Sequence, residues 1–391
     1  MNYPPRTIAI VGAGFSGTAV AINLLQHPSG APLRVMLLDH APAGRGVAYA
    51  SRAYPYLLNV PAGRMSADAA APLDFLNFAL TRFPRATAHD FLPRSLYGEY
   101  LEARLSSAER SAIEGVELER VCGIACALQR GSKGQGYSVR LTDGRTLLAD
   151  EVVLALGNPP SEALPGTEQL LGSASYVADP WTAAAGFRSG ERVLVVGTGL
   201  TMADVVTAGV SASGRDVHVY AISRHGLVPP SQTALGHEHV QVDTRRLLEA
   251  ASFSTRSLFR IVRGLAAEIV GRGGDWRELM NVLRGHAPQL WQRMPVRERQ
   301  RFLRHVRPYW DIHRHRLPHQ TLAELENLRD ERKLSVNAGR IVSLERVGEK
   351  VRVTWQPRGS RAAAARMRRC SSTASSTVPA RTMIRGVLET L

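Results

Sequence analysis

Several features that mark other protein classes are missing from this 391-residue sequence. No apolar run reaches the roughly eighteen residues that a membrane-spanning helix needs, so we expect no membrane segment. Three cysteines are too few for a disulfide scaffold. The Gly-x-Ser-x-Gly, His-Glu-x-x-His and protein-kinase motifs are also absent, so the sequence points to none of these nucleophile, zinc or kinase chemistries. Residues 1–6 lead directly into an apolar strand with no room for a signal peptide, so we expect a cytoplasmic location.

The cysteines do not have the spacing of a redox pair. Cys122 and Cys126 are separated by three residues rather than two, in an apolar stretch that reads as strand. We interpret them as buried thiols, which argues against a disulfide-reductase mechanism.

The net charge of +15 raises nucleic acid as a possible partner. The distribution of this charge argues against that reading, because seven arginines fall in the tail from Arg358 onward and many others lie in residues 293–316. Aromatic residues that stack on bases are few there, namely Phe302, Tyr309 and Trp310. We therefore expect no nucleic-acid and no membrane partner, and a small-molecule substrate instead.

The sequence does contain two glycine-rich turns, each at the end of an apolar run. In the first, residues 8–11 are predicted to be a buried strand and residues 15–26 a helix. The strand 33–38 follows and ends in Asp39, close to the ~20 residues beyond Gly17 at which a carboxylate binds ribose hydroxyls. Amides at such a helix N-terminus hold a pyrophosphate. The predicted site comprises Gly12, Ala13, Gly14, Phe15, Ser16, Gly17 and Asp39.

The second turn follows the apolar run 193–196. The next predicted strand, 217–222, ends at Ser223 without an acidic residue. Arg224 in that place pairs with a 2′-phosphate and favours NADP over NAD; the alternative is a solvated surface arginine. Met202 stands where the fingerprint has Gly or Ala, so we expect its helix to lie farther from the strand and to bind the nucleotide less securely. The turn itself reads Gly197, Thr198, Gly199, Leu200, Thr201 and Met202.

These patterns predict an α/β fold with two Rossmann-like dinucleotide-binding domains, a β-meander and a helical insertion. The predicted first domain spans residues 1–185 and the second spans 186–332, with the insertion at about 235–332. We expect this insertion to cap a substrate pocket. Residues 333–357 are predicted to return as strands of the first domain, and 358–391 to form an aberrant or disordered tail.

The chain resembles the FAD/NAD(P)-binding flavoproteins of the two-dinucleotide-domain superfamily. Within it, the likeness is to a bacterial branch related to flavin N-hydroxylases and Baeyer–Villiger-type monooxygenases, and it covers roughly residues 6–356. The segments that carry it are IAIVGAGFSGTAVA, GRGVAYA, LLNVPAGRMSA, FLPRSLYGEYL, VVLALGNPP, VVGTGLTMAD, ISRHGLVP and FLRHVRPYWDIHRHR. The resemblance implies FAD and NADP(H) as cofactors, with NAD(H) as the alternative for the second.

The resemblance also implies roles for individual residues. Gly12, Gly14 and Gly17 would hold the FAD pyrophosphate, and Asp39 the ribose. Gly46 would approach FAD again. The remaining implied contacts are Gly157 and Asn158 at the cofactor-contacting turn, and Gly197, Gly199, Leu200, Thr201 and Arg224 facing NADP.

Four further features carry weaker signals. Asn59 and Met65 lie either beside the flavin ring or in an ordinary ordered connection, and both interpretations stay open. Tyr97 is expected to be a packing aromatic rather than a proton donor. The stretch 310–316 reads as a buried ion-pair network, with an anion site as the second interpretation, because alternate histidines do not converge on a metal.

The tail departs from the pattern that the family resemblance implies. The strands from residue 334 begin to repeat the order seen at 116–157, so a final strand is expected near 365–378. No strand periodicity occurs there, whereas a shifted reading frame of residues 367–384 allows a valine-rich strand. We therefore hypothesise that the residues after about Gly359 are translated out of frame, which would leave the FAD site incomplete.

The predicted function is an FAD-dependent, NAD(P)H-linked oxidoreductase, monooxygenase-like, that passes electrons to oxygen or an unknown acceptor. A flavin needs position and exclusion of water more than a protein nucleophile, so no catalytic residue is assigned. The alternative is a non-catalytic nucleotide-binding or sensor protein, or a degenerate flavoprotein with an impaired FAD site.

Overall fold

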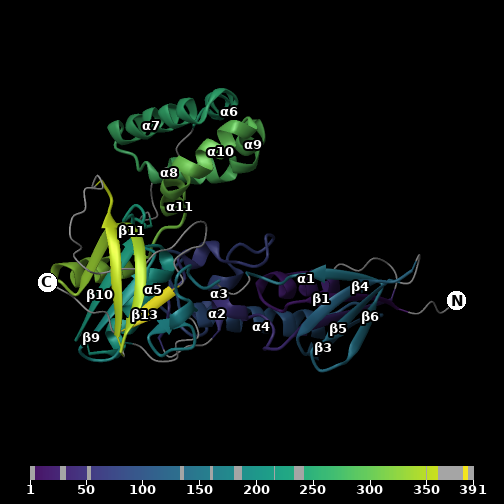
Figure 1. Ribbon diagram of the computed structural model, residues 1–391. Coiled ribbons are helices and arrows are strands. Elements are labelled where there is room, and N and C mark those ends of the chain that lie inside the picture. The colour runs from purple at the N-terminus through teal and green to yellow at the C-terminus, as the bar shows by residue number, and fades with distance from the viewer. Residues whose placement is uncertain are drawn as a thin grey trace. The chain divides into compact units, whose positions relative to one another are not determined.

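The computed structural model describes residues 5–26, 32–50, 54–132, 136–158, 162–179, 187–214, 216–232, 242–348 and 350–359, and the backbone of 382–385 (Figure 1). The chain divides into two compact units, Met1–Pro160 and Ser161–Leu391. The predicted boundary after residue 185 is too late. The short strand β8 (Tyr176–Val177) pairs into the sheet of the second unit, and the turn η2 (Glu168–Leu170) packs on that sheet.

A parallel sheet forms the centre of the first unit, with strand order β3-β2-β1-β7. Its strands are β1 (Arg6–Val11), β2 (Leu33–Asp39), β3 (Val116–Cys122) and β7 (Glu151–Leu154). Helix α1 (Phe15–Gln26) connects β1 to β2. Between β2 and β3 the chain forms α2 (Gly46–Tyr49), η1 (Ala62–Arg64), α3 (Asp74–Leu80) and α4 (Arg94–Arg110). The predicted meander is an antiparallel sheet of β4 (Ala125–Arg130), β5 (Tyr137–Leu141) and β6 (Thr146–Ala149).

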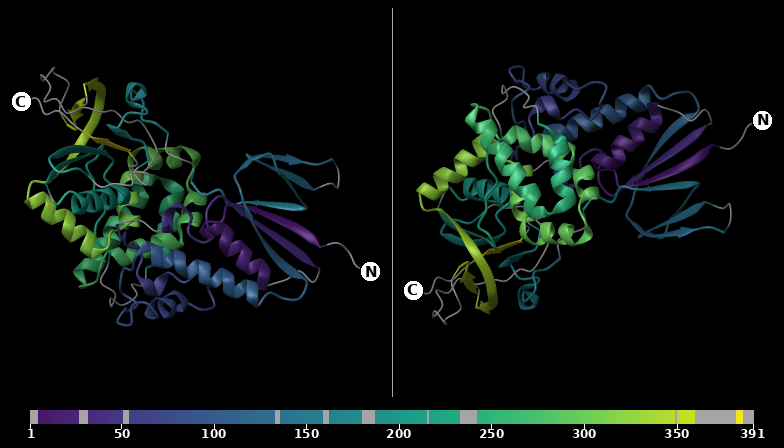
Figure 2. Two further views of the ribbon diagram at one scale, coloured as in Figure 1. Left: turned by 90° about the horizontal axis from the view of Figure 1, so that it is seen from below. Right: turned by 90° about the horizontal axis from the view of Figure 1, so that it is seen from above.

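Both faces of the parallel sheet are buried, which explains why its strands are apolar at consecutive positions. Ile8 and Ile10 of β1 face α1 and α4, where Leu25 and Leu105 complete the core. The alternate residues Ala9 and Val11 pack on the other face, against β5 and β6. Figure 2 shows these layers, with α1 and α4 on one side of the sheet and β4, β5 and β6 on the other. Both faces of the parallel sheet are therefore covered within this unit.

The second unit contains a mixed sheet of order β12-β11-β10-β9-β13-β8. Three of its strands run parallel, namely β9 (Glu191–Val196), β10 (Val217–Ser223) and the first part of β11 (Leu334–Val347). Helices α5 (Leu200–Ala212) and α12 (His319–Asp330) cover one face, and β12 (Lys350–Pro357) pairs antiparallel with β11. This unit is therefore also Rossmann-like, so the predicted fold class is confirmed.

A separate group of helices follows β10 and has its own core. The helices are α6 (Thr244–Phe253), α7 (Thr255–Gly271), α8 (Arg277–Gly285), α9 (Ala287–Arg293), α10 (Val296–His305) and α11 (Arg307–Arg314). Leu247, Leu258, Leu279 and Leu290 belong to this core, which contains no residue of the sheet. The insertion thus forms a hydrophobic cluster of its own. Among the described residues, no helix combines the length and apolar character needed to cross a membrane.

The structure corrects the assignment of the strands after residue 333. Val219 of β10 lies in register with Leu334 of β11, so β11 and β12 extend the sheet of the second unit rather than returning to the first. The tail also contains a strand that its composition does not predict: β13 (Thr382–Arg385) pairs antiparallel with β9 and β8. The final strand expected near 365–378 falls outside the described residues.

The expected burial of the two cysteine thiols is wrong. Cys122 ends β3 and Cys126 lies in β4, and both are exposed and unbridged. Cys122 is the exposed last residue of β3, and β4 contains only half-buried and exposed positions.

Candidate functional site

The first glycine turn is shaped by two close backbone contacts. Gly12 has a φ of +102°, and a Cβ there would lie 2.3 Å from the carbonyl oxygen of Ala155 in the segment that follows β7. A Cβ on Gly17 would lie 1.8 Å from the carbonyl oxygen of Gly12. No side chain fits in either place, so the glycines let α1 begin directly against the end of β1.

Asp39 holds the same turn from the neighbouring strand. Its Oδ2 accepts a hydrogen bond of 2.7 Å from the amide of Ala13, and its Oδ1 accepts bonds from the amides of His40 and Ala41. Two predicted site residues, Asp39 and Ala13, are thus in direct contact. The Asp39 carboxylate therefore fixes the glycine turn, and it also lies at the strand end where the sequence predicts contact with a ribose.

Gly46 approaches the turn from the segment after β2. A Cβ on Gly46 would lie 3.1 Å from the Cα of Gly14, so two bare backbones face each other beside the start of α1. The residue before it is held by a two-pronged ion pair, because Arg45 donates to both oxygens of Glu102 on α4 at 2.6 and 2.9 Å. This pair raises the pKa of the Arg45 guanidinium, although partial burial opposes the shift.

Aromatic side chains line the segment next to this turn. Phe15, at the start of α1, is 41% exposed and stacks on Tyr97 with ring centroids 6.3 Å apart. Tyr97 is buried and also contacts Tyr49 and Phe75 at 4.7 and 5.0 Å. Burial raises the pKa of the Tyr97 hydroxyl well above its usual range. The interpretation of Tyr97 as a packing aromatic is confirmed.

The second glycine turn has the same strand-loop-helix form with different packing. Gly197 has a φ of +107°, and its amide donates to the carbonyl of Ile222 at 2.6 Å. A Cβ on Gly199 would meet nothing within 4 Å, so the backbone at the start of α5 is open. Met202 is 0% exposed and belongs to the core beneath α5. The residue that replaces the third glycine thus acts as a core side chain.

Positive charge collects where β10 ends. Arg224 follows the strand directly and is exposed. The Arg358 guanidinium donates to Nδ1 of His225, and its backbone amide bonds to the carbonyl of Ala338, which lies in register with Ser223. Burial, together with these two arginines, lowers the pKa of His225. The imidazole therefore stays neutral and leaves two cations beside it for an anion.

Comparison with known proteins agrees with this geometry. Residues 9–159 match a sequence family described as FAD-NAD(P)-binding. The first unit contains an FAD-NAD(P)-binding domain. A search of curated proteins gave no match.

Solved structures resemble the chain over most of its length. Ornithine hydroxylase from Pseudomonas aeruginosa aligns with a TM-score of 0.56 and 12% identity, over 95% of this chain and 81% of that one. The ornithine N-hydroxylase of Kutzneria sp. 744, solved with FAD and NADP+, gives 0.52 and 16% identity over 91% and 77%. L-lysine 6-monooxygenase from Pseudomonas syringae gives 0.52 and 15% identity over 95% and 80%. At these identities the likeness concerns the fold.

The FAD-NAD(P)-binding domain offers a backbone-lined space that suits a pyrophosphate. Gly14 and Gly46 face each other without side chains. Helix α1 starts at Phe15, directly after Gly14, so its first backbone amides lie next to this space. An α-helix N-terminus attracts anions through its unpaired amides. The residues of this turn therefore fit FAD, and contact of Gly12 to Gly17 and of Asp39 with the cofactor stays a prediction.

Other predicted residues of the domain lie in less constrained positions. Gly157 has a φ of +67° with nothing within 4 Å of its added Cβ, and Gly157 and Asn158 are both exposed. Asn59 is half-buried, and Met65 packs on the cluster around Tyr100. Met65 thus supports the interpretation of this loop as an ordered connection, and contact of either residue with a cofactor stays a prediction.

The histidine- and arginine-rich stretch at 310–316 is less buried than the sequence interpretation holds. Asp311 pairs with Arg307 and Arg314 at 3.4 and 3.6 Å on half-exposed side chains. The spacing of Asp311 and His315 would allow a side-chain pair on a helix, but here the His315 backbone amide donates to the Asp311 carbonyl. Arg316 alone is deeply buried, 2% exposed, and donates to Oδ1 of Asn281 at 2.7 Å. The part of the chain that the structure describes contains no cluster of three or more His, Cys, Asp or Glu side chains suited to a metal ion.

Sequence reasoning missed Arg358 as a site residue. The sequence places it at the start of an aberrant or disordered tail, whereas it follows β12 and contacts His225. Its only sequence signal is its position one residue after an apolar strand. That signal is uninformative until the pairing of β11 with β10 is known.

Proposed function

We propose that this chain is an FAD-dependent oxidoreductase that uses NADPH, with FAD at the first glycine turn and NADPH at the second. The observation that carries the proposal is the presence of two strand-turn-helix units, each with bare backbone at the helix start, at Gly14 and at Gly199. When bound, FAD would accept a hydride from NADPH and release two electrons to dioxygen, forming hydrogen peroxide, or to another acceptor.

The chain's own residues bind and orient in this scheme. The amides from Gly14 to Gly17 would hold the pyrophosphate, because those of Gly12 and Ala13 already donate to Leu38 and Asp39. Asp39 keeps the loop in place through Ala13. The ring of Phe15, the first residue of α1, stacks on the buried Tyr97. Arg45, fixed by Glu102, holds the Gly46 segment against the turn.

A monooxygenase reaction is the finer form of the proposal. In that reaction the substrate gains one oxygen atom of dioxygen and the other leaves as water, with NADPH supplying the two electrons. The fold shared with ornithine and lysine hydroxylases supports this form.

The test is the absorbance spectrum of the purified full chain, before and after added FAD. We expect the bands of oxidised flavin, bleached faster by NADPH than by NADH. Peroxide release in air without substrate marks uncoupled oxidase turnover, and its fall when a substrate is added marks hydroxylation. Protein that takes up no FAD, or bound flavin that neither nicotinamide reduces, contradicts the proposal.

A matched pair of variants separates cofactor binding from folding. Gly14→Ala places a methyl group in the space facing Gly46, at an ordinary contact distance of 3.7 Å, so the protein should fold. Loss of one or two hydrogen bonds to the pyrophosphate lowers FAD affinity about tenfold or more. Gly285→Ala, at the open end of α8, is the control and should leave FAD affinity unchanged.

One observation favours the alternative, a nucleotide-binding protein without turnover. Leu154 and Leu156 on and after β7 are 56% and 66% exposed, next to the first turn. Among the described residues no strand pairs with the outer edge of β7. An open edge here agrees with weak flavin retention, and with the hypothesis of an out-of-frame tail, which sequencing of the encoding DNA tests. Tight FAD binding with rapid reduction by NADPH would rule this alternative out.

A further inference from the structure

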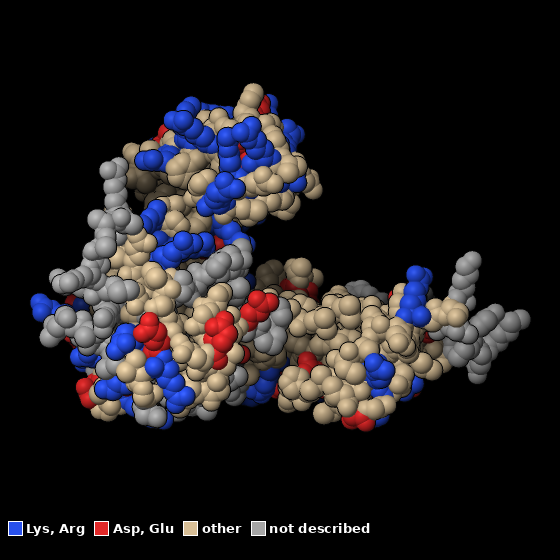
Figure 3. All heavy atoms as spheres, in the orientation of Figure 1, with Lys and Arg blue, Asp and Glu red and all other residues tan. Residues whose placement is uncertain are grey.

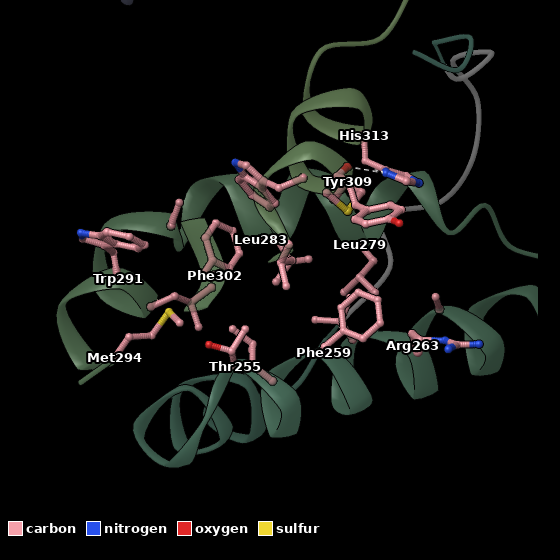
Figure 4. A pocket seen from close by; sticks show the side chains of 18 of the residues that line it. Thr255, Phe259, Arg263, Leu279, Leu283, Trp291, Met294, Phe302, Tyr309 and His313 are labelled. Carbon is pink, nitrogen blue, oxygen red and sulfur yellow. Dashed lines mark hydrogen bonds between the residues drawn. The ribbon is translucent and has the colours of Figure 1, made fainter. Parts of the chain in front are cut away.

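The inserted helices line a half-open apolar cavity that none of the proposed flavin contacts uses. Its volume is about 510 Å³, within the range of roughly 300–1,000 Å³ typical of small-molecule sites. Helix α7 forms one wall and α8, α9, α10 and α11 supply the rest (Figure 4). All of its lining residues belong to the inserted segment, so the site is independent of how the two units are arranged.

The sequence of α7 explains why this helix forms an apolar wall of the cavity. Leu258, Val262 and Ala266 recur at a spacing of four residues and line one face of the helix toward the cavity. The aromatic side chains opposite come from α9, α10 and α11 and from Trp276 just before α8, and three of the chain's five tryptophans are among them. Such a lining suits the body of a hydrophobic ligand and offers it few hydrogen bonds.

Polar groups gather at one end of this cavity. In Figure 4, Arg263, Tyr309 and His313 lie at one end, and Trp291 and Met294 lie at the other. The ring of His313 is fixed by a bond of 2.6 Å between its Nδ1 and the carbonyl of Tyr309. Arg263 is exposed and makes no ion pair with any described residue. The cavity is therefore apolar along its length and cationic at one end.

The surrounding surface has the same sign of charge. Residues 244–316 contain sixteen arginines and no lysine, against six carboxylates. Figure 3 shows these basic side chains spread over the helices. Several pair internally, as Arg301 does with Glu298 and Arg277 with Asp275. The excess favours an anionic ligand and disfavours a cationic one of the same shape.

We propose that this cavity binds a hydrophobic carboxylate of medium chain length, with its hydrocarbon body between α7 and the facing helices and its carboxylate at Arg263. The proposal does not rest on the proposed redox function, because the helices that line the cavity have their own core. The ligand is either an effector or the small molecule on which the enzyme acts.

The test is a titration of the full chain, with and without FAD, followed by tryptophan fluorescence and calorimetry. The probes are octanoate, decanoate and dodecanoate below their micellar concentrations, with decanol and decyltrimethylammonium as head-group controls. We expect saturable binding that tightens about fourfold for each added methylene. Decanoate should bind best among the ten-carbon probes. Equal binding of the cationic probe, or no saturable binding of any carboxylate, overturns the proposal.

Two matched pairs of variants on α7 locate the site. Ala266→Phe fills the cavity and should abolish binding, whereas Ala267→Phe, on the exposed face one residue later, should not. Arg263→Gln should weaken carboxylate binding about fivefold without affecting decanol, whereas Arg260→Gln should change neither. Equal effects within either pair overturn the assignment. Binding to anionic vesicles without binding of free carboxylates also overturns it, in favour of a membrane surface.

Discussion

The two arginines at the end of β10 give a direct test of nicotinamide selectivity. We predict that Arg224→Gln and Arg358→Gln each weaken NADPH binding and leave NADH binding almost unchanged. Both residues act on His225, which places their charges close to each other. The 2′-phosphate of NADPH is the one group that distinguishes the two nucleotides, and arginine is the side chain best suited to bind it.

The expected loss of NADPH affinity depends on how exposed the two arginine side chains are. Two unit charges about 4 Å apart interact by ~4 kcal/mol at the effective dielectric of a protein surface, which sets a ceiling. Exposed ion pairs keep about 0.2–1 kcal/mol of this after screening and ordering of the side chains. Arg224 is exposed, so its loss should raise the Kd of NADPH by about fivefold. Arg358 is anchored at its backbone, and its loss should have a similar or larger effect.

The assay is a fluorescence titration of each variant with NADPH and with NADH, at low and at high salt. Arg329→Gln, an exposed arginine on α12, controls for the general loss of positive charge. The reasoning is refuted if the Kd of both nucleotides rises by the same factor, or if Arg329→Gln has the same effect as Arg224→Gln. Removal of both arginines also tests whether their contributions add, as expected only for independent contacts.

The same site should respond to pH. The pKa of His225 is held below its ordinary value, so the imidazole is neutral near pH 7. A bound phosphate would stabilise the protonated ring and raise that pKa, so NADPH binding takes up a proton. The affinity for NADPH should therefore rise as the pH falls from about 8 toward 6, more steeply than for NADH. A parallel pH dependence for both nucleotides would place the phosphate elsewhere.

Three further predictions concern stability, each measured by chemical denaturation. Gly17→Ala forces a Cβ to within 1.8 Å of a carbonyl oxygen and should cost several kcal/mol or prevent folding, whereas Gly264→Ala, in open space on α7, should stabilise by about 0.5–1 kcal/mol. Met202→Ala removes a fully buried side chain and should cost about 2–5 kcal/mol. Burial, aided by Arg314, lowers the pKa of His315 in the folded protein. Because the unfolded chain then binds more protons at this histidine, the free energy of unfolding should fall as the pH drops below about 6.5. This fall should be smaller in His315→Gln.

The first strand-turn-helix unit could be predicted from the sequence almost to the residue. The helix predicted over 15–26 has the same bounds as α1. The strand predicted over 33–38 is one residue longer in the structure and ends at Asp39. These elements are determined locally, by apolar runs and by glycines that fit where no side chain can. The predicted site residues Ala13, Asp39 and Gly46 meet for the same reason, because the turn and the next strand end are close in sequence.

The pairing of the late strands could not be predicted in this way. Leu334 pairs with Val219, more than a hundred residues earlier, across the whole helical insertion. A short apolar run does not identify the strand it pairs with, so the sequence places residues 333–357 in the sheet of the first domain, whereas β11 pairs with β10. The error also concealed Arg358, whose role depends on the position that β11 and β12 give it.

The two glycine turns differ in how the helix packs against the preceding strand, and we expect this difference to affect their affinities for the nucleotides. At the first turn, Gly17 lets the helix lie against the carbonyl of Gly12, and the loop is further tied by Asp39. At the second turn, Met202 fills the equivalent place as a buried core residue, and Thr198 bonds instead to Ser223 and Leu227. The first loop is fixed by close packing of its own backbone and by the Asp39 carboxylate of the neighbouring strand. The second loop is fixed largely by the side chains of Met202 and Thr198. Its affinity for NADPH should therefore depend more on the phosphate contacts of Arg224 and Arg358, and loss of these arginines should weaken NADPH binding.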